Sequence, residues 1–560
     1  MELPTGGGCA RIIRTAWQTP GGTTEHMADT IGQERRARPV AHRRDTTYQF
    51  PVYRWLSWLV VAGYLAGLGV MCLVAGMFGI PAPLGWAFVV IVCLAGIALL
   101  DRPRAMMNAM MFYILLMPSN RLLGLVGLPL PGFIDELLFL PPIAVIVMNL
   151  VQGRMVKGGN WFPVLFGMVT ALSWYVNGKQ GLPVTVKILL VNLKFFIIWY
   201  FCRLTLSFKN TKELFRWCWL FIGFAAIQFA YNTLWHQAPW PRYHPDRSGG
   251  VFGPDSMCAH YVGYLSSIAL FLLAGWVATR WNKLTLRRKW GVLFVGLVVL
   301  YDLVFMTDTK HVLFLIPLAC GGLLFLPGIP AKFKWSMGSC AVVVVMASVV
   351  YLHTQNLKGY MPVLHNFGSM PKGQLFKAVT VDFPHLVRYP VLGAGPGRFA
   401  SDAAREARAP LARIYITPYY DEALRLGYFG RRGTTSISSV AGSVNTDFFY
   451  IVSEFGWLGE IVYAAFWVYC AFSLYRKGIQ AREARSEAWG VCWALAVSLV
   501  LFMMLQLLTS VCTMPCLAFP VWMMVGRVWD MPVAGPEDEK KLLSEGAQED
   551  GEFGFALPDA

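Results

Sequence analysis

Long apolar segments alternate with short polar ones along most of this chain. Crossing about 30 Å of hydrocarbon at 1.5 Å per residue takes about 20 apolar residues in helical form. Segments near that length recur, whereas the ten-residue alternating pattern of membrane barrel strands does not. We therefore expect an all-α polytopic membrane protein with about 12–14 transmembrane helices. The predicted spans are 55–78, 82–100, 105–117, 133–150, 161–176, 185–206, 214–235, 257–278, 290–306, 311–327, 335–352, 446–475, 488–508 and 514–529.

Polar segments divide the chain into five parts. The spans occupy 51–352 and 446–530, and one large hydrophilic loop, 353–445, lies between them. A basic arm, 1–50, and an acidic tail, 531–560, lack the apolar residues that would offset the entropy of ordering a chain. Both ends are therefore expected to be disordered.

The distribution of Lys and Arg in the short loops predicts the orientation. If the N-terminus is cytoplasmic, basic residues gather in the cytoplasmic loops, as in the loop 279–289, in agreement with the positive-inside rule. An even number of spans then places both termini in the cytoplasm and the loop 353–445 on the outer face. The net charge of +16 is thus assigned to topology and lipid attraction, and no nucleic-acid partner is expected.

Composition supports a membrane location. Charged residues make up 14% of the chain, and a soluble protein carries about 25%. The 12 cysteines lie mostly within spans, where they act as small apolar residues. No metal-ligand spacing is evident, so we expect neither a metal nor another cofactor.

Charged residues within the predicted spans are the first candidates for function. Lys187 and Lys194 are seven residues apart and so share one helix face. Lys194 lies about 13 Å deep at 1.5 Å per residue, where an ammonium needs a partner or a wet cavity. It is either half of an internal ion pair or part of a cationic site for an anionic lipid headgroup. Glu454 is expected at a similar depth and is the suggested partner.

Outer segments supply the other candidates. The loop 240–255 contains Arg247 in a cluster that suits phosphate binding, although an ordinary solvated loop has the same composition. The turn 307–311 offers Lys310 and His311 for phosphate contact or proton transfer. The glycine-rich run 390–399, with Arg398, predicts a tight turn similar to a phosphate-binding loop. Asn445 and Asp447 follow at the start of the next span.

Taken in order, these segments resemble the bacterial O-antigen ligase and polymerase superfamily. The resemblance covers roughly 185–475 and includes the position of the large outer loop. It rests on Gly250-Val-Phe-Gly-Pro-Asp-Ser-Met-Cys-Ala259, Thr307-Asp-Thr-Lys310, Pro390-Val-Leu-Gly-Ala-Gly-Pro-Gly-Arg-Phe399 and Val444-Asn445, followed by Glu454-x-Gly-x-x-Gly459. The chain departs from the family at Asp255 (family Asn), Lys310 (family Arg) and Val444 (family His).

The resemblance implies a metal-independent glycosyltransferase in the bacterial inner membrane. It would move a glycan from a polyprenyl-diphosphate carrier to a glycan or lipid acceptor in surface or exopolysaccharide assembly. The expected roles are diphosphate binding for Lys194, Arg247 and Lys310 and general base for Asp447 or His311. The remaining residues expected to bind substrate are Lys187, Arg398, Asn445 and Glu454.

Two other classes stay open on sequence grounds. A multi-pass transporter or lipid-linked glycan flippase would distribute charged residues along a path through the membrane, whereas here they gather in the outer half. The other multi-span type of glycosyltransferase carries acidic motifs in a large first outer loop, which here is only a few residues long.

Overall fold

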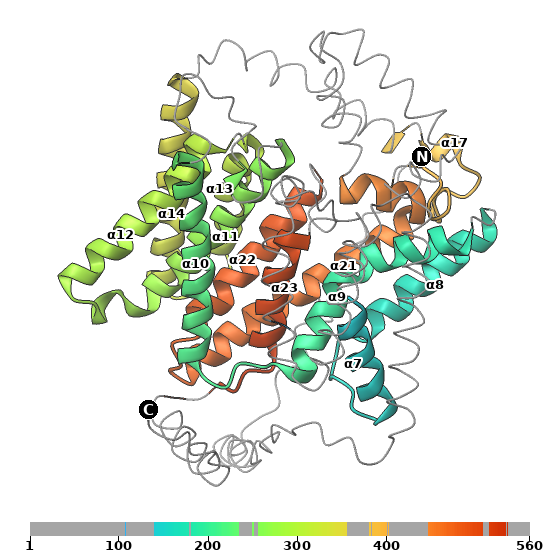
Figure 1. Cartoon of the computed structure of the whole chain (residues 1–560), viewed down its shortest axis with the longest axis horizontal. Coiled ribbons are helices and arrows are strands. Elements are labelled where there is room, and N and C mark those ends of the chain that lie inside the picture. Colours follow the sequence, from blue (N-terminus) through green and yellow to red (C-terminus); the bar gives the residue numbers. More distant parts are fainter. Residues whose placement is uncertain are drawn as a thin grey trace, which may run out of the picture. The chain divides into compact units, whose positions relative to one another are not determined.

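The computed structural model describes an assembly of helices joined by turns (Figure 1). The described residues are 139–177, 181–234, 249–250, 256–307, 309–354, 380–381, 383–399, 401, 446–507, 515–533 and 535, together with Met107. The long elements are α7 (Leu140–Val151), α8 (Trp161–Val176), α9 (Leu182–Thr205), α10 (Thr211–Leu234), α11 (Ser256–Arg280), α12 (Leu286–Tyr301), α13 (Lys310–Leu324), α14 (Ala331–Thr354), α21 (Asp447–Glu483), α22 (Trp489–Gln506) and α23 (Pro515–Trp529). The short ones are η4 (Trp281–Lys283), the π-helical η5 (Asp302–Met306) and α17 (Phe383–Leu386). The predicted all-α class is thus confirmed for this part of the chain.

Every predicted span from 133–150 onward has a helix at its position. Within the described residues, 7 helices are long and apolar enough to cross a membrane, and three shorter apolar helices accompany them. The predictions for 55–78, 82–100, 105–117, most of the loop 353–445 and both tails fall outside the described residues, apart from Met107 and the ends of these segments. A multi-pass membrane protein is therefore supported, without fixing the total number of spans or the orientation.

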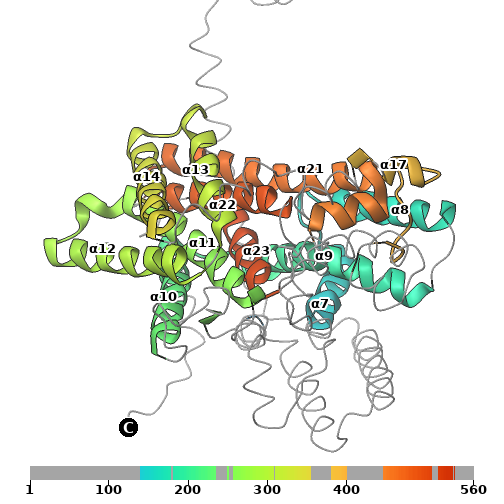
Figure 2. The ribbon, with the colours of Figure 1, turned by 90° about the horizontal axis from the view of Figure 1, so that it is seen from above.

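The helix that passes through the centre of the assembly is α21. It packs along α22, α22 packs on α11, and α9 packs on α23 (Figures 1 and 2). Buried aromatic rings join these helices: the rings of Phe162 and Phe466 stack 4.4 Å apart, and those of Trp467 and Trp522 meet edge to face at 4.7 Å. Such close ring contacts fix the rotation of α21 about its axis and thereby position its first half.

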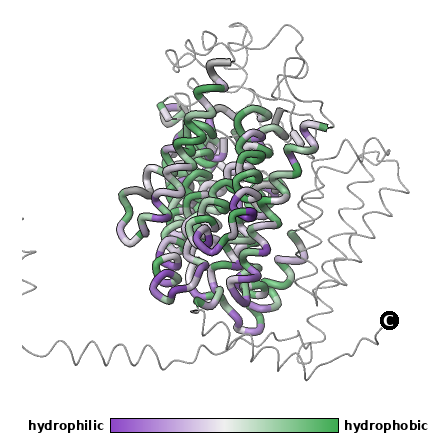
Figure 3. Tube along the Cα trace, turned by 90° about the vertical axis from the view of Figure 1, so that its left-hand side faces the viewer, coloured by the Kyte–Doolittle hydropathy of each residue, from purple (hydrophilic) through white to green (hydrophobic). Residues whose placement is uncertain are grey.

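The outward faces of several helices are apolar. The membrane-length window of α14 is only 17% buried, and Met346 on it is 62% exposed. Figure 3 shows apolar positions along the helices and hydrophilic positions concentrated toward one end of the bundle. A water-soluble protein rarely exposes so much continuous apolar surface, which suits lipid contact.

Buried arginines fasten the ends of α9 and α23. Arg203 forms a two-bonded ion pair with Asp530, with its Nε 2.8 Å from Oδ2, and lies between two tryptophan rings. Arg527 pairs with Glu213 of α10 and donates a bond of 2.8 Å to the carbonyl of Leu206. These bonds hold the last described helix against α9 and α10.

A further ion-pair cluster links η4 and the end of α11 to the turn before α22. Arg280 Nε and Lys283 Nζ each lie 2.5 Å from a carboxylate oxygen of Glu487. Partial burial opposes the charged form, but the bonds from Lys283 and Arg280 outweigh it and hold the pKa of Glu487 below its ordinary value. A lowered native pKa stabilises the fold above the unfolded pKa, and that stability is lost as the pH falls through the native pKa.

Glu487→Gln is therefore expected to lower the melting temperature at pH 7, by the equivalent of about 1 kcal/mol. The difference from the parent protein should shrink as the pH falls below the usual glutamate pKa of about 4.3. Melting in detergent between pH 7 and pH 3 measures it. Exposed Glu483 provides the control, because Glu483→Gln removes the same charge. A Glu487→Gln deficit that stays constant across the pH range would contradict the explanation.

Candidate functional site

The glycine-rich run 390–399 forms a buried turn against the first half of α21. Gly393, Gly395 and Gly397 have φ values of 71°, 99° and 74°, in the left-handed region that residues with a Cβ rarely adopt. A Cβ on Gly393 would lie 2.5 Å from the backbone nitrogen of Gly456. The glycines therefore serve close backbone approach as well as the turn.

The turn and α21 exchange backbone hydrogen bonds at a kink. Gly456 has φ 71° and ψ −175°, which interrupts the helix. The carbonyl of Glu454, freed by this kink, accepts from the N–H of Gly395 at 3.1 Å. In a regular helix the N–H of Leu458 would donate to the carbonyl of Glu454, but here it donates to the carbonyl of Val391 at 3.1 Å. The bonds that the kink breaks are thus replaced by bonds to the glycine-rich turn.

A serine of α8 completes this junction. The hydroxyl of Ser173 lies 2.6 Å from the carbonyl oxygen of Leu392 and 3.0 Å from that of Glu454. The N–H of Ala394 donates to the carbonyl of Ser453 at 2.7 Å. Three segments far apart in the sequence therefore meet at one buried point.

The carboxylate of Glu454 occupies the cradle of N–H groups that follows the turn. Its Oε2 accepts from the N–H of Gly397 at 2.8 Å, and its Oε1 accepts from those of Phe399 at 3.3 Å and Ser401 at 2.9 Å. Glu454 is fully buried, with 0% exposure. Hydrogen bonds to a carboxylate are stronger than neutral ones, so these offset much of the cost of burial.

This arrangement changes the interpretation of the glycine run. From the sequence, the run resembled a phosphate-binding loop, but two of its amides and one just after it bind a carboxylate of the same chain. The segment 390–401 is therefore anchored by Glu454. Glu454 thus lies inside the bundle among hydrogen-bond donors, and its expected role in binding substrate stays a prediction.

The described residues show no ion pair between Glu454 and Lys194, the pairing suggested from the sequence. Lys194 is 6% exposed on α9, and its Nζ lies 5.6 Å from the centre of the Phe139 ring. Lys187 on the same helix and Arg398 beside the turn are half-buried.

Asp447, a candidate base, is the first residue of α21 and is completely buried. Thr446 caps the helix by accepting from the N–H of Phe449 at 3.1 Å. Glu460 lies near enough for its charge to interact with that of Asp447, although thirteen positions separate them. Sequence reasoning missed this second carboxyl group. Asn445 and Arg247 lie outside the described residues.

His311, the other candidate base, belongs to a cluster with α11. Its Nε2 lies 2.7 Å from the hydroxyl of Tyr264, and its ring centre is 5.2 Å from that of His260. His260 and Tyr264 are four residues apart and so share a helix face, a signal that the sequence contained but that was not used. Lys310 begins α13, and its side chain is not among the described ones. The expected binding of diphosphate by Lys194, Arg247 and Lys310 thus stays a prediction.

A fully buried carboxyl group, Asp302, was also missed. It opens the π-helix η5 and accepts from Asn232 at 2.9 Å and from Ser266 at 3.2 Å. The side-chain oxygen of Asn232 in turn accepts from the N–H of Gly250 at 2.7 Å. This network ties α10, α11 and η5 to the first residue of the Gly250–Ala259 motif.

Among the described candidates, Arg398 and Glu454 belong to the anchored turn and its junction with α21, Lys187 and Lys194 lie on α9, Asp447 begins α21, and His311 contacts α11. Several of these side chains can accept or donate a proton. Comparison with known proteins adds no name to this geometry, since no protein-family model, curated protein or solved structure matches the chain.

Proposed function

We propose that this protein is a membrane glycosyltransferase of the O-antigen ligase and polymerase type. It moves a glycan from a polyprenyl-diphosphate carrier to an acceptor hydroxyl. The observation that carries the proposal is the junction of Pro390–Phe399 with Glu454 and Gly456. Two of the motifs behind the resemblance fold onto each other, which is expected if they belong to one functional unit and not if each matched by chance.

The reaction requires a base and a way to stabilise the leaving group. The acceptor oxygen forms a bond to the anomeric carbon, the bond from that carbon to the diphosphate oxygen breaks, and the hydroxyl proton passes to the base. His311, with Tyr264 at 2.7 Å, and buried Asp447 are the candidates for the base. The diphosphate leaves with its charge stabilised by Lys194, Arg247 and Lys310.

The proposal includes a topology. About 12–14 spans cross the bacterial cytoplasmic membrane, both termini are cytoplasmic, and the loop 353–445 covers the outer face. Such a loop limits the access of water, which would otherwise accept the glycan and hydrolyse the donor. Anchoring by Glu454 gives this loop a fixed point near the middle of its length, close to the bundle.

Deletion of the gene, followed by complementation, tests the proposal. Loss of the protein is expected to abolish a surface glycan, and the lipid-linked precursor of that glycan is expected to accumulate. Complementation with His311→Ala is expected to reduce transfer by about 100-fold, the lower end of the contribution of a general base. Exposed His385 of α17 provides the matched control, and His385→Ala should restore transfer. Unchanged surface glycans and lipid-linked precursors after deletion would refute the proposal.

A transporter or lipid-linked glycan flippase is the second candidate, favoured by Asp302. A carboxyl group buried among Asn232 and Ser266 within a membrane bundle is typical of proton-coupled transport. The same deletion separates the two functions by the face on which the precursor accumulates. Loss of transfer leaves it on the outer face, and loss of flipping leaves it on the cytoplasmic face.

A further inference from the structure

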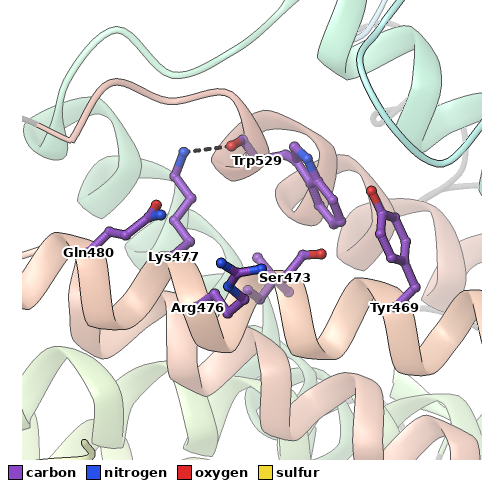
Figure 4. A pocket seen from close by; sticks show the side chains of 7 residues that line it. Tyr469, Ser473, Arg476, Lys477, Gln480 and Trp529 are labelled. Carbon is purple, nitrogen blue, oxygen red and sulfur yellow. Dashed lines mark hydrogen bonds between the residues drawn. The ribbon is translucent and has the colours of Figure 1, made fainter. Parts of the chain in front are cut away.

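A cavity of about 220 Å³ lies between the second half of α21 and the end of α23, away from the anchored turn (Figure 4). Its volume is several times the share of one water molecule in the liquid, about 30 Å³. The residues that line it are Tyr469, Ser473, Leu474, Arg476, Lys477, Gln480 and Trp529.

Two cationic side chains line the cavity, and neither forms a salt bridge with an acidic side chain of the described residues. The ammonium of Lys477 donates to the carbonyls of Trp529 at 2.5 Å and Met531 at 2.7 Å. These bonds use two of its three N–H groups and fix its position. The guanidinium of Arg476 is exposed and lies 5.9 Å from the centre of the Phe472 ring. The carboxylate of Asp530, which follows Trp529, accepts two bonds from Arg203, and its charge also acts on Lys477.

The other polar groups of the lining can all donate hydrogen bonds. They are the hydroxyls of Tyr469 and Ser473 and the amide of Gln480. Figure 4 shows Tyr469 and Trp529 at one side and Lys477 at the other, with Ser473 between them along α21. A donor-rich cavity with two cations and no carboxylate among its lining residues suits an anion.

The surroundings favour a phosphate group. Along the chain, the lining residues of α21 are followed by the basic residues Arg482 and Arg485, at the end of the helix that the positive-inside rule predicts to be cytoplasmic. Basic pockets between membrane helices on that side are suited to anionic lipid headgroups. Arginine binds phosphate through parallel N–H bonds, and lysine contributes a point charge.

We propose that this cavity binds a phosphate group at the cytoplasmic end of α21, presented by an anionic lipid headgroup or as a soluble phosphate. The site is separate from the proposed transferase chemistry and does not depend on it. Its bound phosphate joins α21 to the C-terminal end of α23 through Arg476 and Lys477.

Native mass spectrometry of the purified full chain tests this proposal. The protein is titrated with phosphatidylglycerol, phosphatidylcholine and inorganic phosphate in separate experiments. Arg476→Gln is expected to weaken binding of the anionic ligand about tenfold, since a hydrogen bond to a charged group is lost. Arg476→Lys keeps the charge and should recover part of the affinity. Arg288→Gln, an exposed arginine of α12 on the same predicted face, removes an equal charge outside the cavity and should have no effect.

The outcomes separate the sources of phosphate. Preferential binding of phosphatidylglycerol that Arg476→Gln weakens supports a lipid site, and displacement of that lipid by inorganic phosphate supports a soluble anion. Equal affinity for both lipids together with no phosphate binding overturns the proposal. An equal loss of affinity for the anionic ligand in Arg476→Gln and Arg288→Gln also overturns it. Melting curves for each variant identify any loss of binding that is due to unfolding. If Arg476→Gln unfolds, the affinity of Arg476→Lys for the anionic ligand tests the proposal in its place.

Discussion

Glu454→Ala is expected to lower the free energy of unfolding by about 3 kcal/mol or more, because it leaves three buried N–H groups without an acceptor. Those groups belong to Gly397, Phe399 and Ser401, and each now donates to the carboxylate. The loss should release the segment 390–401 from α21. Thermal melting in detergent measures the stability, and limited proteolysis should show new cleavage in this segment.

Two glutamine variants sharpen this test. Glu454→Gln keeps one oxygen acceptor but places an NH₂ group against an N–H donor, so we expect a smaller loss of about 1–3 kcal/mol. Glu460 is a second glutamate on α21, and its buried Oε2 has no hydrogen-bond partner among the described residues. Glu460→Gln should therefore cost less than 1 kcal/mol. Equal effects of the two glutamine substitutions would show that the amide cradle contributes nothing specific.

Gly456→Ala is expected to be comparably destabilising. Gly456 has φ 71° and ψ −175°, a region that is essentially restricted to glycine. An added Cβ would lie 2.1 Å from the carbonyl oxygen of Val391, and that oxygen accepts from Leu458. Strain of about 1–3 kcal/mol thus combines with loss of the turn's bonds to the kink. Loss of the monodisperse peak on size-exclusion chromatography, or a melting temperature lower by many degrees, would report it.

Gly223 provides the matched control for that substitution. It lies within α10, and an added Cβ would meet nothing within 4 Å. Alanine is favoured over glycine in a helix by about 1 kcal/mol, so Gly223→Ala should leave the stability unchanged or raise it. If Gly456→Ala changed the stability no more than Gly223→Ala, the description of the kink at Gly456 would be wrong.

The helices could be predicted from the sequence because a span is a local property of about 20 residues. The main difference within the described part is that α21 continues to Glu483, past the predicted end at 475. Residues such as Arg476, Lys477 and Gln480 are good helix formers, and their long side chains can reach from an apolar environment to water. A hydropathy window ends at the first charges, whereas the helix does not.

The candidate site could be predicted only in part. The glycine run and Glu454 were both recognised, but not as partners, because their contact depends on a kink that only the three-dimensional path reveals. Depth along a helix suggested Lys194 for Glu454, although depth does not specify which face two residues share. Asp302 was missed because a single polar residue near a span end carries little signal alone, whereas Tyr264 could have been recognised from its spacing of four residues from His260.

The anchor also bears on where substrate phosphate would bind. The amides after Gly395 already hold a carboxylate, so they are not open to a diphosphate unless Glu454 leaves. The proposed transfer reaction must therefore use side-chain cations, as assigned to Lys194, Arg247 and Lys310. This requirement distinguishes the protein from enzymes that hold phosphate in a glycine-rich loop of backbone N–H groups.

Hydrogen exchange at the segment 397–401 tests the central structural claim most directly. If the carboxylate of Glu454 accepts from these amides, their exchange measured by mass spectrometry is slow in the parent protein. It should be faster by about 100-fold or more in Glu454→Ala, the factor that corresponds to about 3 kcal/mol. Peptides from α22 should exchange equally in both proteins. Fast exchange at 397–401 in the parent protein, or equal exchange in the two proteins, would contradict the account.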